Sequence, residues 1–296
     1  MTYSIVARDP ATGELGVAVQ SHWFSVGPIV PWARPGVGAV ATQANAEPAY
    51  GPRALDLIAA GASAHEALRA LLDGDPLAES RQVAVLDAAG SVAVHTGSEC
   101  IAHAGHAASD GVSCQANIMA SPTVWPAMLD AYRAAEGPLA DRLLEALRAA
   151  EAQGGDLRGR QSSAILVVPA AGESWRTSCS LRVEDHPEPL AELERLVALD
   201  RAYRIAAEGD ELLAAGRAQE AAARFVRALS AGADLGQGAA ELRFWAGLGL
   251  VHTGELERGA RLVAQALQEH AALALLLERL PAGMASAAAA VRERLR

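Results

Sequence analysis

The sequence predicts an α+β fold in which two β-sheets pack face to face between helices, a four-layer αββα sandwich, followed by an all-helical domain. Predicted strands alternate with pairs of predicted helices through the first two thirds of the chain. Several of these strands are apolar on both faces, and such strands must be covered on both sides. Beyond the proline-rich segment 185–189 only helical patterns follow, so we expect domains at residues 1–188 and 189–296.

The chain begins with a predicted β-hairpin made of Thr2–Arg8, the turn segment 9–13 and Gly16–Ser21. If Arg8 faces Leu15 across the turn, the register of the hairpin is fixed. The same register places Thr2 opposite Ser21. Because both segments are apolar without interruption, we expect them to be adjacent central strands of one sheet.

Turn and cap signals separate the remaining elements of the first domain. Gly61 suits the end of one helix, and Ser63 with Glu66 has the pattern of a capping box that opens the next. The glycine- and proline-rich segments 23–35 and 47–53 indicate loops. The predicted strands are 36–43, 82–87, 91–96, 112–119, 162–168 and 174–183, and the predicted helices are 53–60, 63–72, 122–135 and 138–153.

A helical pattern repeats in the second domain with a period of 38 residues. Gly216 aligns with Gly254, and Phe225 aligns with Val263. Helix pairs with small residues at the crossing are typical of tetratricopeptide-like (TPR-like) repeats. We therefore expect this domain to bind a protein partner or to mediate homo-oligomerisation, as a dimer.

Composition excludes several classes of function. The net charge of −10 and the pI near 5.3 argue against nucleic acid and anionic membranes as partners. All 25 basic residues are arginine, which excludes a Schiff-base lysine and a P-loop lysine. No signal peptide and no apolar segment long enough for a membrane span are found, so a cytoplasmic protein is expected.

No cofactor or metal is expected. His95, Cys100, His103 and His106 are spread over a loop without the signature of a tetrahedral zinc site. We interpret them as histidines whose hydrogen bonds are satisfied locally, although His106 is retained as a candidate substrate-binding residue in the cleft.

Thr2 is the candidate nucleophile. A threonine hydroxyl needs a base within hydrogen-bond reach. Removal of Met1 would leave a free α-amine on Thr2, with a pKa near 7.7–8.0, which can accept the proton. The alternative is an ordinary strand that begins near the N-terminus.

Other candidate site residues are polar side chains at strand ends. Gln43 and Asn45 end one strand, whereas Gln115 and Asn117 share one face of another. Amides in apolar strands need partners, and they can serve as substrate clamps. Arg160 precedes a buried strand and can bind a carboxylate of a substrate, or it can pair with a surface acid.

The runs TYSIVARDPATGELGVAVQS, PWARPGVGAVATQ, AYGPRALDLIAAG, SCQANIMAS, GRQSSAILVV and LRVEDHPEPLAEL resemble the DUF1028 family, from residue 2 to about residue 195. The resemblance implies the αββα fold of the N-terminal-nucleophile (Ntn) hydrolases and, by analogy, hydrolysis of an amide bond. It also implies Thr2, Gln20 and Ser21 as catalytic residues, because polar groups end the second strand in that superfamily. Glu47 stands where the family commonly has asparagine, so it is a candidate substrate-binding position.

Two hypotheses follow from the sequence. The first is an Ntn-type amidohydrolase acting on a small-molecule amide, with Thr2 as nucleophile. The second is a catalytically silent fold that acts as a binding or scaffold protein through its helical domain. The region around ELRFWAGLGLVHTGELERGARL resembles a module labelled peptidoglycan-binding, but no signal for export supports that role. A serine or cysteine hydrolase of another type is disfavoured because no GxSxG motif is present.

Overall fold

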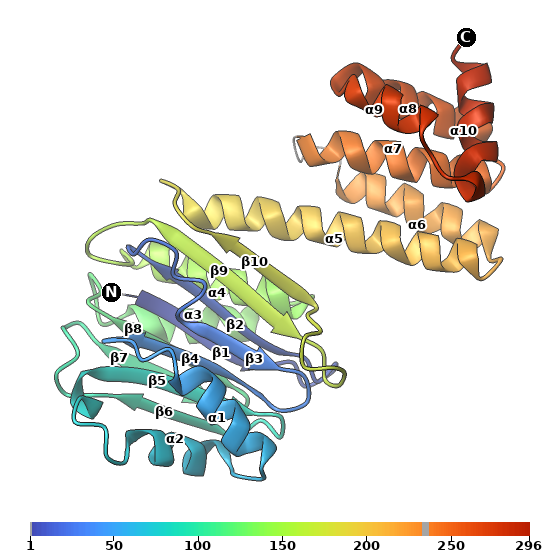
Figure 1. Cartoon of the computed structure of the whole chain (residues 1–296). Helices are drawn as coiled ribbons and strands as arrows, with labels where there is room; N and C mark the ends of the chain where they lie inside the picture. Colours follow the sequence, from blue (N-terminus) through green and yellow to red (C-terminus); the bar gives the residue numbers. More distant parts are fainter. Residues whose placement is uncertain (1, 233–236) are drawn as a thin grey trace. The chain divides into compact units, whose positions relative to one another are not determined.

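The computed structural model describes residues 2–232 and 237–296, and its contacts divide the chain into two units. The first unit ends at Glu194 and the second comprises Arg195–Arg296. The first contains antiparallel sheets with helices, and the C-terminal region is helical (Figure 1). The division falls inside helix α5, Pro189–Ala214, and therefore lies beyond the expected boundary at residue 188.

The strands of the first unit are β1 Thr2–Arg8, β2 Leu15–Ser21, β3 Pro31–Arg34, β4 Gly38–Ala44, β5 Arg81–Asp87, β6 Val92–Thr96, β7 Gly105–Ser109, β8 Val112–Asn117, β9 Ser162–Val168 and β10 Cys179–Val183. Its helices are α1 Tyr50–Ala59, α2 Ala64–Leu72, the short 3₁₀ turn Ala78–Ser80, α3 Val124–Ala134 and α4 Leu139–Ala152. The capping box predicted at the start of α2 is confirmed, since Ser63 Oγ accepts from Glu66 N and the Glu66 carboxylate accepts from Ser63 N.

The N-terminal hairpin forms the centre of a six-stranded sheet with the order β10-β9-β2-β1-β8-β7. Its register pairs Arg8 with Leu15 and Tyr3 with Gln20, as the sequence predicts. β1 also pairs with β8, and β2 also pairs with β9, so both hairpin strands are central. The start of β1 is therefore held on both sides by neighbouring strands.

The second sheet has four strands in the order β3-β4-β5-β6. β3 lies within segment 23–35, so the prediction of a continuous loop there was wrong. β7, at the edge of the six-stranded sheet, was also missed, because the loop interpretation of the histidine segment covered it. Both strands are short, and glycine or proline beside them resembles turn chemistry.

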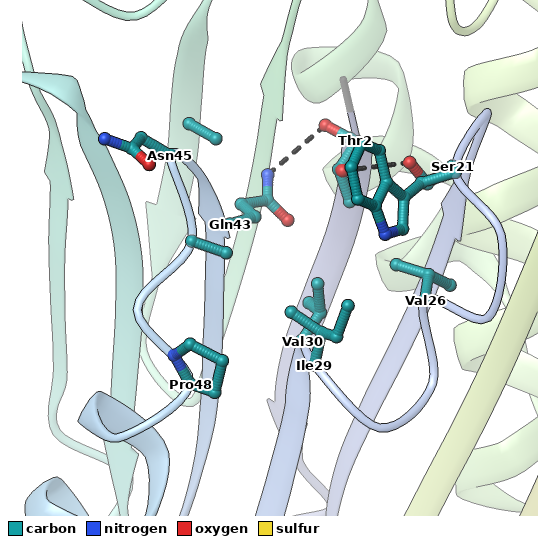
Figure 2. Close-up of a pocket in the computed structure, with 11 residues that line it drawn as sticks. Thr2, Ser21, Val26, Ile29, Val30, Gln43, Asn45 and Pro48 are labelled. Atoms are coloured by element: carbon teal, nitrogen blue, oxygen red, sulfur yellow. Dashed lines mark hydrogen bonds between the residues drawn. The ribbon is translucent and has the colours of Figure 1, made fainter.

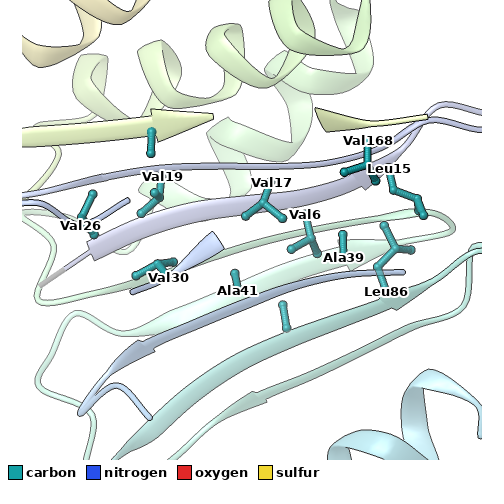
Figure 3. Packing of buried hydrophobic residues seen from close by; sticks show 12 residues of the cluster. Val6, Leu15, Val17, Val19, Val26, Val30, Ala39, Ala41, Leu86 and Val168 are labelled. Carbon is teal, nitrogen blue, oxygen red and sulfur yellow. The ribbon is translucent and has the colours of Figure 1, made fainter. Parts of the chain in front are cut away.

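The two sheets stack through an aliphatic core, and helices cover their outer faces. Val6, Val17 and Val19 of the larger sheet pack with Ala39 and Leu86 of the smaller one (Figure 3). Helices α3 and α4 pack on the six-stranded sheet, whereas α1 and α2 pack on the four-stranded sheet. The side-chain alternation of β1 follows from these layers, since even-numbered residues face the other sheet and odd-numbered residues face the helices.

The helical region continues with α6 Ala218–Ala231, α7 Gln237–His252, α8 Leu256–Glu269, α9 Ala272–Glu278 and α10 Ala282–Arg294. Gly216 and Gly254 precede α6 and α8 with φ of 75° and 95°, a left-handed conformation that suits glycine. Phe225 and Val263, the aligned large residues of the repeat, are both buried. The repeat in the sequence thus corresponds to equivalent helices with equivalent buried positions.

A chain that ends at Glu194 is expected to stay folded, because the sheets and their covering helices all lie before that residue. It should unfold in urea in one cooperative transition with a native-like far-ultraviolet spectrum. Loss of the cooperative transition would show that the second unit is needed for folding of the first.

Candidate active site

A cavity of about 320 Å³ lies at the end of the two sheets where β1 begins (Figure 2). It is bounded by the ends of β2 and β4 and by the segments that follow those strands. Its lining residues are Thr2, Ser21, Trp23, Val26, Ile29, Val30, Gln43, Ala44, Asn45, Ala46 and Pro48. Four of the candidates from the sequence, Thr2, Ser21, Gln43 and Asn45, are therefore brought together here.

The Thr2 side chain faces the space between the sheets because it has the same alternation as the core residues of β1. Thr2 is only 6% exposed, and its Oγ1 lies 3.1 Å from Ser21 Oγ, close enough for a hydrogen bond in which either hydroxyl donates. The predicted proximity of Thr2 and Ser21 is confirmed. A buried hydroxyl at the wall of a cavity is a reasonable nucleophile once a base is present.

Two amides hold the backbone of Thr2. Gln43 Nε2 donates to Thr2 O over 3.3 Å, and Asn117 Nδ2 donates to the same oxygen over 3.4 Å (Figure 2 shows the first). Gln43 comes from the four-stranded sheet and Asn117 from the six-stranded sheet. The position of residue 2 is therefore fixed from both sheets at once.

Gln82, at the start of β5, joins these two amides, and sequence reasoning missed it. Its Oε1 accepts from Gln43 Nε2 at 2.7 Å and from Asn117 Nδ2 at 2.9 Å. Its Nε2 donates to Ala116 O at 2.9 Å and to Thr96 Oγ1 at 3.0 Å. Gln82 is fully buried, so each of these bonds satisfies a group that water does not reach.

Gln115 belongs to the same buried network but does not line the cavity. Its Nε2 donates to Ser4 Oγ at 2.6 Å, and its Oε1 accepts from Ser113 Oγ at 2.9 Å. Ser4 Oγ in turn donates to Gln43 Oε1 at 2.6 Å. Gln115 and Asn117 are thus placed as supports of the sheets around Thr2, not in contact with the cavity.

Gln20 faces away from the cavity, which corrects its place among the catalytic candidates. It pairs with Tyr3, whose side chain points to the helices, and Ser21 is the residue of β2 that faces Thr2. Gln20 is fully buried, and neither Oε1 nor Nε2 has a hydrogen-bond partner within the described part of the chain. It cannot reach Thr2 Oγ1 from the opposite face of the sheet.

Behind Asn45, an ion-paired arginine supports the cavity rim. Arg81 Nη1 donates to Asn45 O at 2.6 Å, Arg81 Nε lies 2.9 Å from Asp75, and Arg81 Nη2 lies 4.0 Å from Glu47. The Glu47 side chain therefore points to Arg81, and Glu47 does not line the cavity. Hydrogen bonds from Arg81 and then from Tyr50 hold the pKa of Asp75 well below its usual range.

Replacing Asp75 by asparagine is expected to lower stability at neutral pH, because the carboxylate accepts from both Arg81 and Tyr50. The folded-state pKa of Asp75 is depressed, so its stabilisation is complete above the unfolded pKa near 3.9 and is lost as pH falls below it. Urea midpoints of the two proteins should therefore differ at pH 7 and approach each other toward pH 3. An equal difference at both pH values would contradict the ion-pair role.

Arg160 and His106 do not line the cavity either. Arg160 Nε lies 2.5 Å from Glu151 Oε2, and its Nη1 pairs with Glu188, so its charge is satisfied within the protein. The same Glu151 accepts from Tyr3 OH at 2.5 Å, and burial, then Glu151, raises the pKa of Tyr3. These contacts correct the proposal that Arg160 binds substrate.

His106 lies on β7, with Nδ1 2.9 Å from Thr96 Oγ1. Thr96 Oγ1 also accepts from Gln82 Nε2 at 3.0 Å, so the Thr96 hydroxyl links His106 to Gln82. Burial, then His95, lowers the pKa of His106, which favours the neutral form of the ring. His106 is linked to the network around Thr2 but does not reach the cavity.

Across 2–232 and 237–296, no group of three or more His, Cys, Asp or Glu side chains is arranged to hold a metal ion. Within the same residues, no helix is both long enough and apolar enough to cross a membrane.

Comparison with known proteins places the chain in a family. A model of a family of unknown function, DUF1028, matches residues 2–193. The crystal structure of protein SPO2555 from Silicibacter pomeroyi, described with the DUF1028 family model, is 30% identical and aligns with a TM-score of 0.60 over 66% of this chain and 87% of that chain. The ancestral β-subunit Anbu from Yersinia bercovieri is 16% identical over 67% of this chain and 96% of its own, with a TM-score of only 0.33. No curated protein matches the chain. The resemblance seen in the sequence is thereby confirmed at the level of the family, and this protein belongs to the DUF1028 family.

Proposed function

We propose that the protein is an N-terminal-nucleophile amidohydrolase that cleaves the amide bond of a small molecule, with Thr2 as nucleophile after removal of Met1. The proposal rests chiefly on the Thr2 hydroxyl, which lies at the wall of a cavity beside Ser21 Oγ. Met1 itself lies outside the described residues. Thr2 is small, so an aminopeptidase can remove the preceding methionine.

The chemistry needs only Thr2 and water. The α-amine accepts the proton of the hydroxyl as Oγ1 attacks the carbonyl carbon of the amide. The tetrahedral intermediate then collapses, the C–N bond breaks, and the amine returns its proton to the leaving nitrogen. Water, activated by the same amine, hydrolyses the ester on Thr2 and releases the carboxylic acid.

The surrounding residues support these roles by position. The carbonyl of Thr2 accepts from Gln43 and Asn117, which limits the movement of the residue that carries both nucleophile and base. Ser21 Oγ contacts the attacking oxygen and orients it. A nucleophile held in a fixed position reacts faster, because even a small displacement from the carbonyl carbon lowers the reaction rate strongly.

We also propose a superfamily for the fold of the first unit and a repeat type for the helices of the second. Two antiparallel sheets between helix pairs, with residue 2 at the start of a central strand, favour an Ntn-hydrolase-like first unit. The equivalent helices α6 and α8, each preceded by a left-handed glycine, favour TPR-like repeats in the second unit. Such repeats suit a protein partner or dimer formation, and we propose the cytoplasm as the location.

The mass of the intact protein tests the proposal. Protein produced without an N-terminal extension should lack the mass of the initiator methionine. A protein that keeps Met1 and still hydrolyses amides would contradict the proposed base. A protein that lacks Met1 but hydrolyses no amide would favour the second hypothesis, a catalytically silent fold that binds partners through its helices.

A further inference from the structure

The cavity beside Thr2 is apolar and holds no charged side chain. Seven of its eleven lining residues are apolar, and none of the lining residues that the structure describes carries a charge. Val26, Ile29 and Val30 come from the segment after β2, and they face Pro48 from the segment after β4 (Figure 2). Ligands of such a cavity lose their water and gain apolar contact in return.

Hydrogen bonds hold this wall to the sheets. Val26 N donates to Ser162 Oγ at 3.1 Å, and Thr42 N donates to Val30 O at 3.2 Å. Val26 and Val30 are each only 2% exposed. The segment that forms this wall is therefore fixed before a ligand arrives, and Trp23 and Ile29 present more of its accessible apolar surface than the two valines do.

The polar groups near the cavity are already engaged or lie at its ends. Gln43 Oε1 accepts from Ser4 Oγ, and Gln43 Nε2 donates to Gln82 Oε1, so this amide has little capacity left for a ligand. The hydroxyls of Thr2 and Ser21 lie at one end, and Asn45 lies on the rim. A ligand can thus place one polar group at Thr2 while the rest of it remains in apolar surroundings.

The arginine behind the cavity rim is paired with one carboxylate and faces a second. The positive charge of Arg81, behind Asn45, is paired with Asp75 and faces Glu47. No uncompensated positive charge is left there for an anionic ligand. An anion beside the amine of Thr2 would also stabilise the ammonium form, raise its pKa and so remove the base.

We propose that the substrate is an uncharged amide of about ten non-hydrogen atoms, since the cavity has the volume of about ten liquid water molecules. Its apolar group packs against Trp23, Val26, Ile29 and Val30, with the amide carbonyl at Thr2 Oγ1. This assignment rests on the proposed function for the position of the scissile bond and for the effect of an anion on the Thr2 amine, whereas the absence of charged side chains among the described lining residues is a property of the cavity itself.

The test uses three amides of the same size and shape. 3-Methylbutanamide is neutral, 2-(dimethylamino)acetamide is a cation at neutral pH, and malonamate is an anion, and all three have the same number of non-hydrogen atoms. Binding to the Thr2→Ala protein is measured by ligand-observed NMR titration, so that no turnover interferes. We expect the neutral amide to bind, and both charged amides to bind at least about tenfold more weakly.

A matched pair of exposed aromatic residues supplies the control. Trp23 is 57% exposed and lines the cavity, whereas its neighbour Phe24 is 63% exposed and does not. Trp23→Ala should weaken binding of 3-methylbutanamide about fivefold, and Phe24→Ala should leave it unchanged.

Three results would each overturn this assignment. They are equal or tighter binding of either charged amide, binding of none of the three amides, and an equal effect of the two aromatic variants. Preference for the cation would point instead to recognition by Glu47. Because binding is measured without the Thr2 hydroxyl, a protein that binds as expected but shows no turnover in its wild-type form would refute only the proposed hydrolysis. Turnover without selection against charge would refute only the assignment of substrate class.

Discussion

Thr2→Ala should reduce hydrolysis of neutral amides at least about a thousandfold, because the hydroxyl forms the covalent bond and no other group in the strand can replace it. Stability should change little, since the hydroxyl makes one hydrogen bond, to Ser21, worth about 1 kcal/mol. Ammonia release and the urea midpoint measure the two effects separately. A large loss of stability with a proportionate loss of activity would indicate a structural role only.

Two further variants sharpen this result. Thr2→Ser keeps both the hydroxyl and the amine and should retain part of the activity. Thr12→Ala removes an exposed threonine in the turn of the N-terminal hairpin and should leave activity unchanged. If Thr2→Ser were as inactive as Thr2→Ala, the methyl group and not the hydroxyl would be the important feature of residue 2.

The α-amine of Thr2, as the proposed base, predicts how the activity depends on pH. Activity should fall as pH drops below the pKa of the α-amine, about 7.7–8.0 if unperturbed, because the ammonium form cannot accept the proton. An uncleaved N-terminal extension should be as damaging as Thr2→Ala, since it converts the amine to an amide. Full activity of the extended protein would exclude the amine as base.

Gln82→Leu should destabilise the protein by about 3 kcal/mol, the largest stability effect that we expect from a single polar residue. The substitution keeps the volume but removes the acceptor of Gln43 Nε2 and Asn117 Nδ2 and the donor to Ala116 O. A buried polar group that loses its hydrogen-bond partner lowers the stability of the protein by more than the hydrogen bond itself contributes. Urea unfolding of the full chain measures the change.

Gln219→Leu is the matched control, because Gln219 is exposed on α6 and the same substitution there buries nothing. We expect a change of less than about 0.5 kcal/mol at this position. A small effect of Gln82→Leu, similar to that of the control, would show that the network does not stabilise the junction of the two sheets.

Most of the fold could be predicted because its signals are local. The register of the N-terminal hairpin followed from one pairing across its turn, and β9 was predicted with the bounds that it has. β3 was missed because four residues beside proline and glycine have too little alternation to be told from a loop. Its pairing with β4, a tertiary contact, makes it a strand.

The site was less predictable because it depends on which face a side chain occupies. Gln20 was a catalytic candidate because polar groups end the second strand in the superfamily that the sequence resembles. Alternation, however, puts Gln20 and Ser21 on opposite faces of β2, and the predicted register already implied this. Gln82 gave no signal beyond one polar residue at the start of a strand. Only the stacking of the two sheets brings it to Gln43 and Asn117.

Covalent labelling with a small β-lactone tests most directly whether Thr2 is a nucleophile activated by its own amine. The lactone acylates an activated hydroxyl and adds its whole mass, and peptide mass spectrometry locates the adduct. We predict one adduct, on residue 2, that is absent from Thr2→Ala and from a protein with an uncleaved N-terminal extension. An adduct on Ser21 or Cys100, or labelling of residue 2 that persists in the extended protein, would contradict the proposed chemistry.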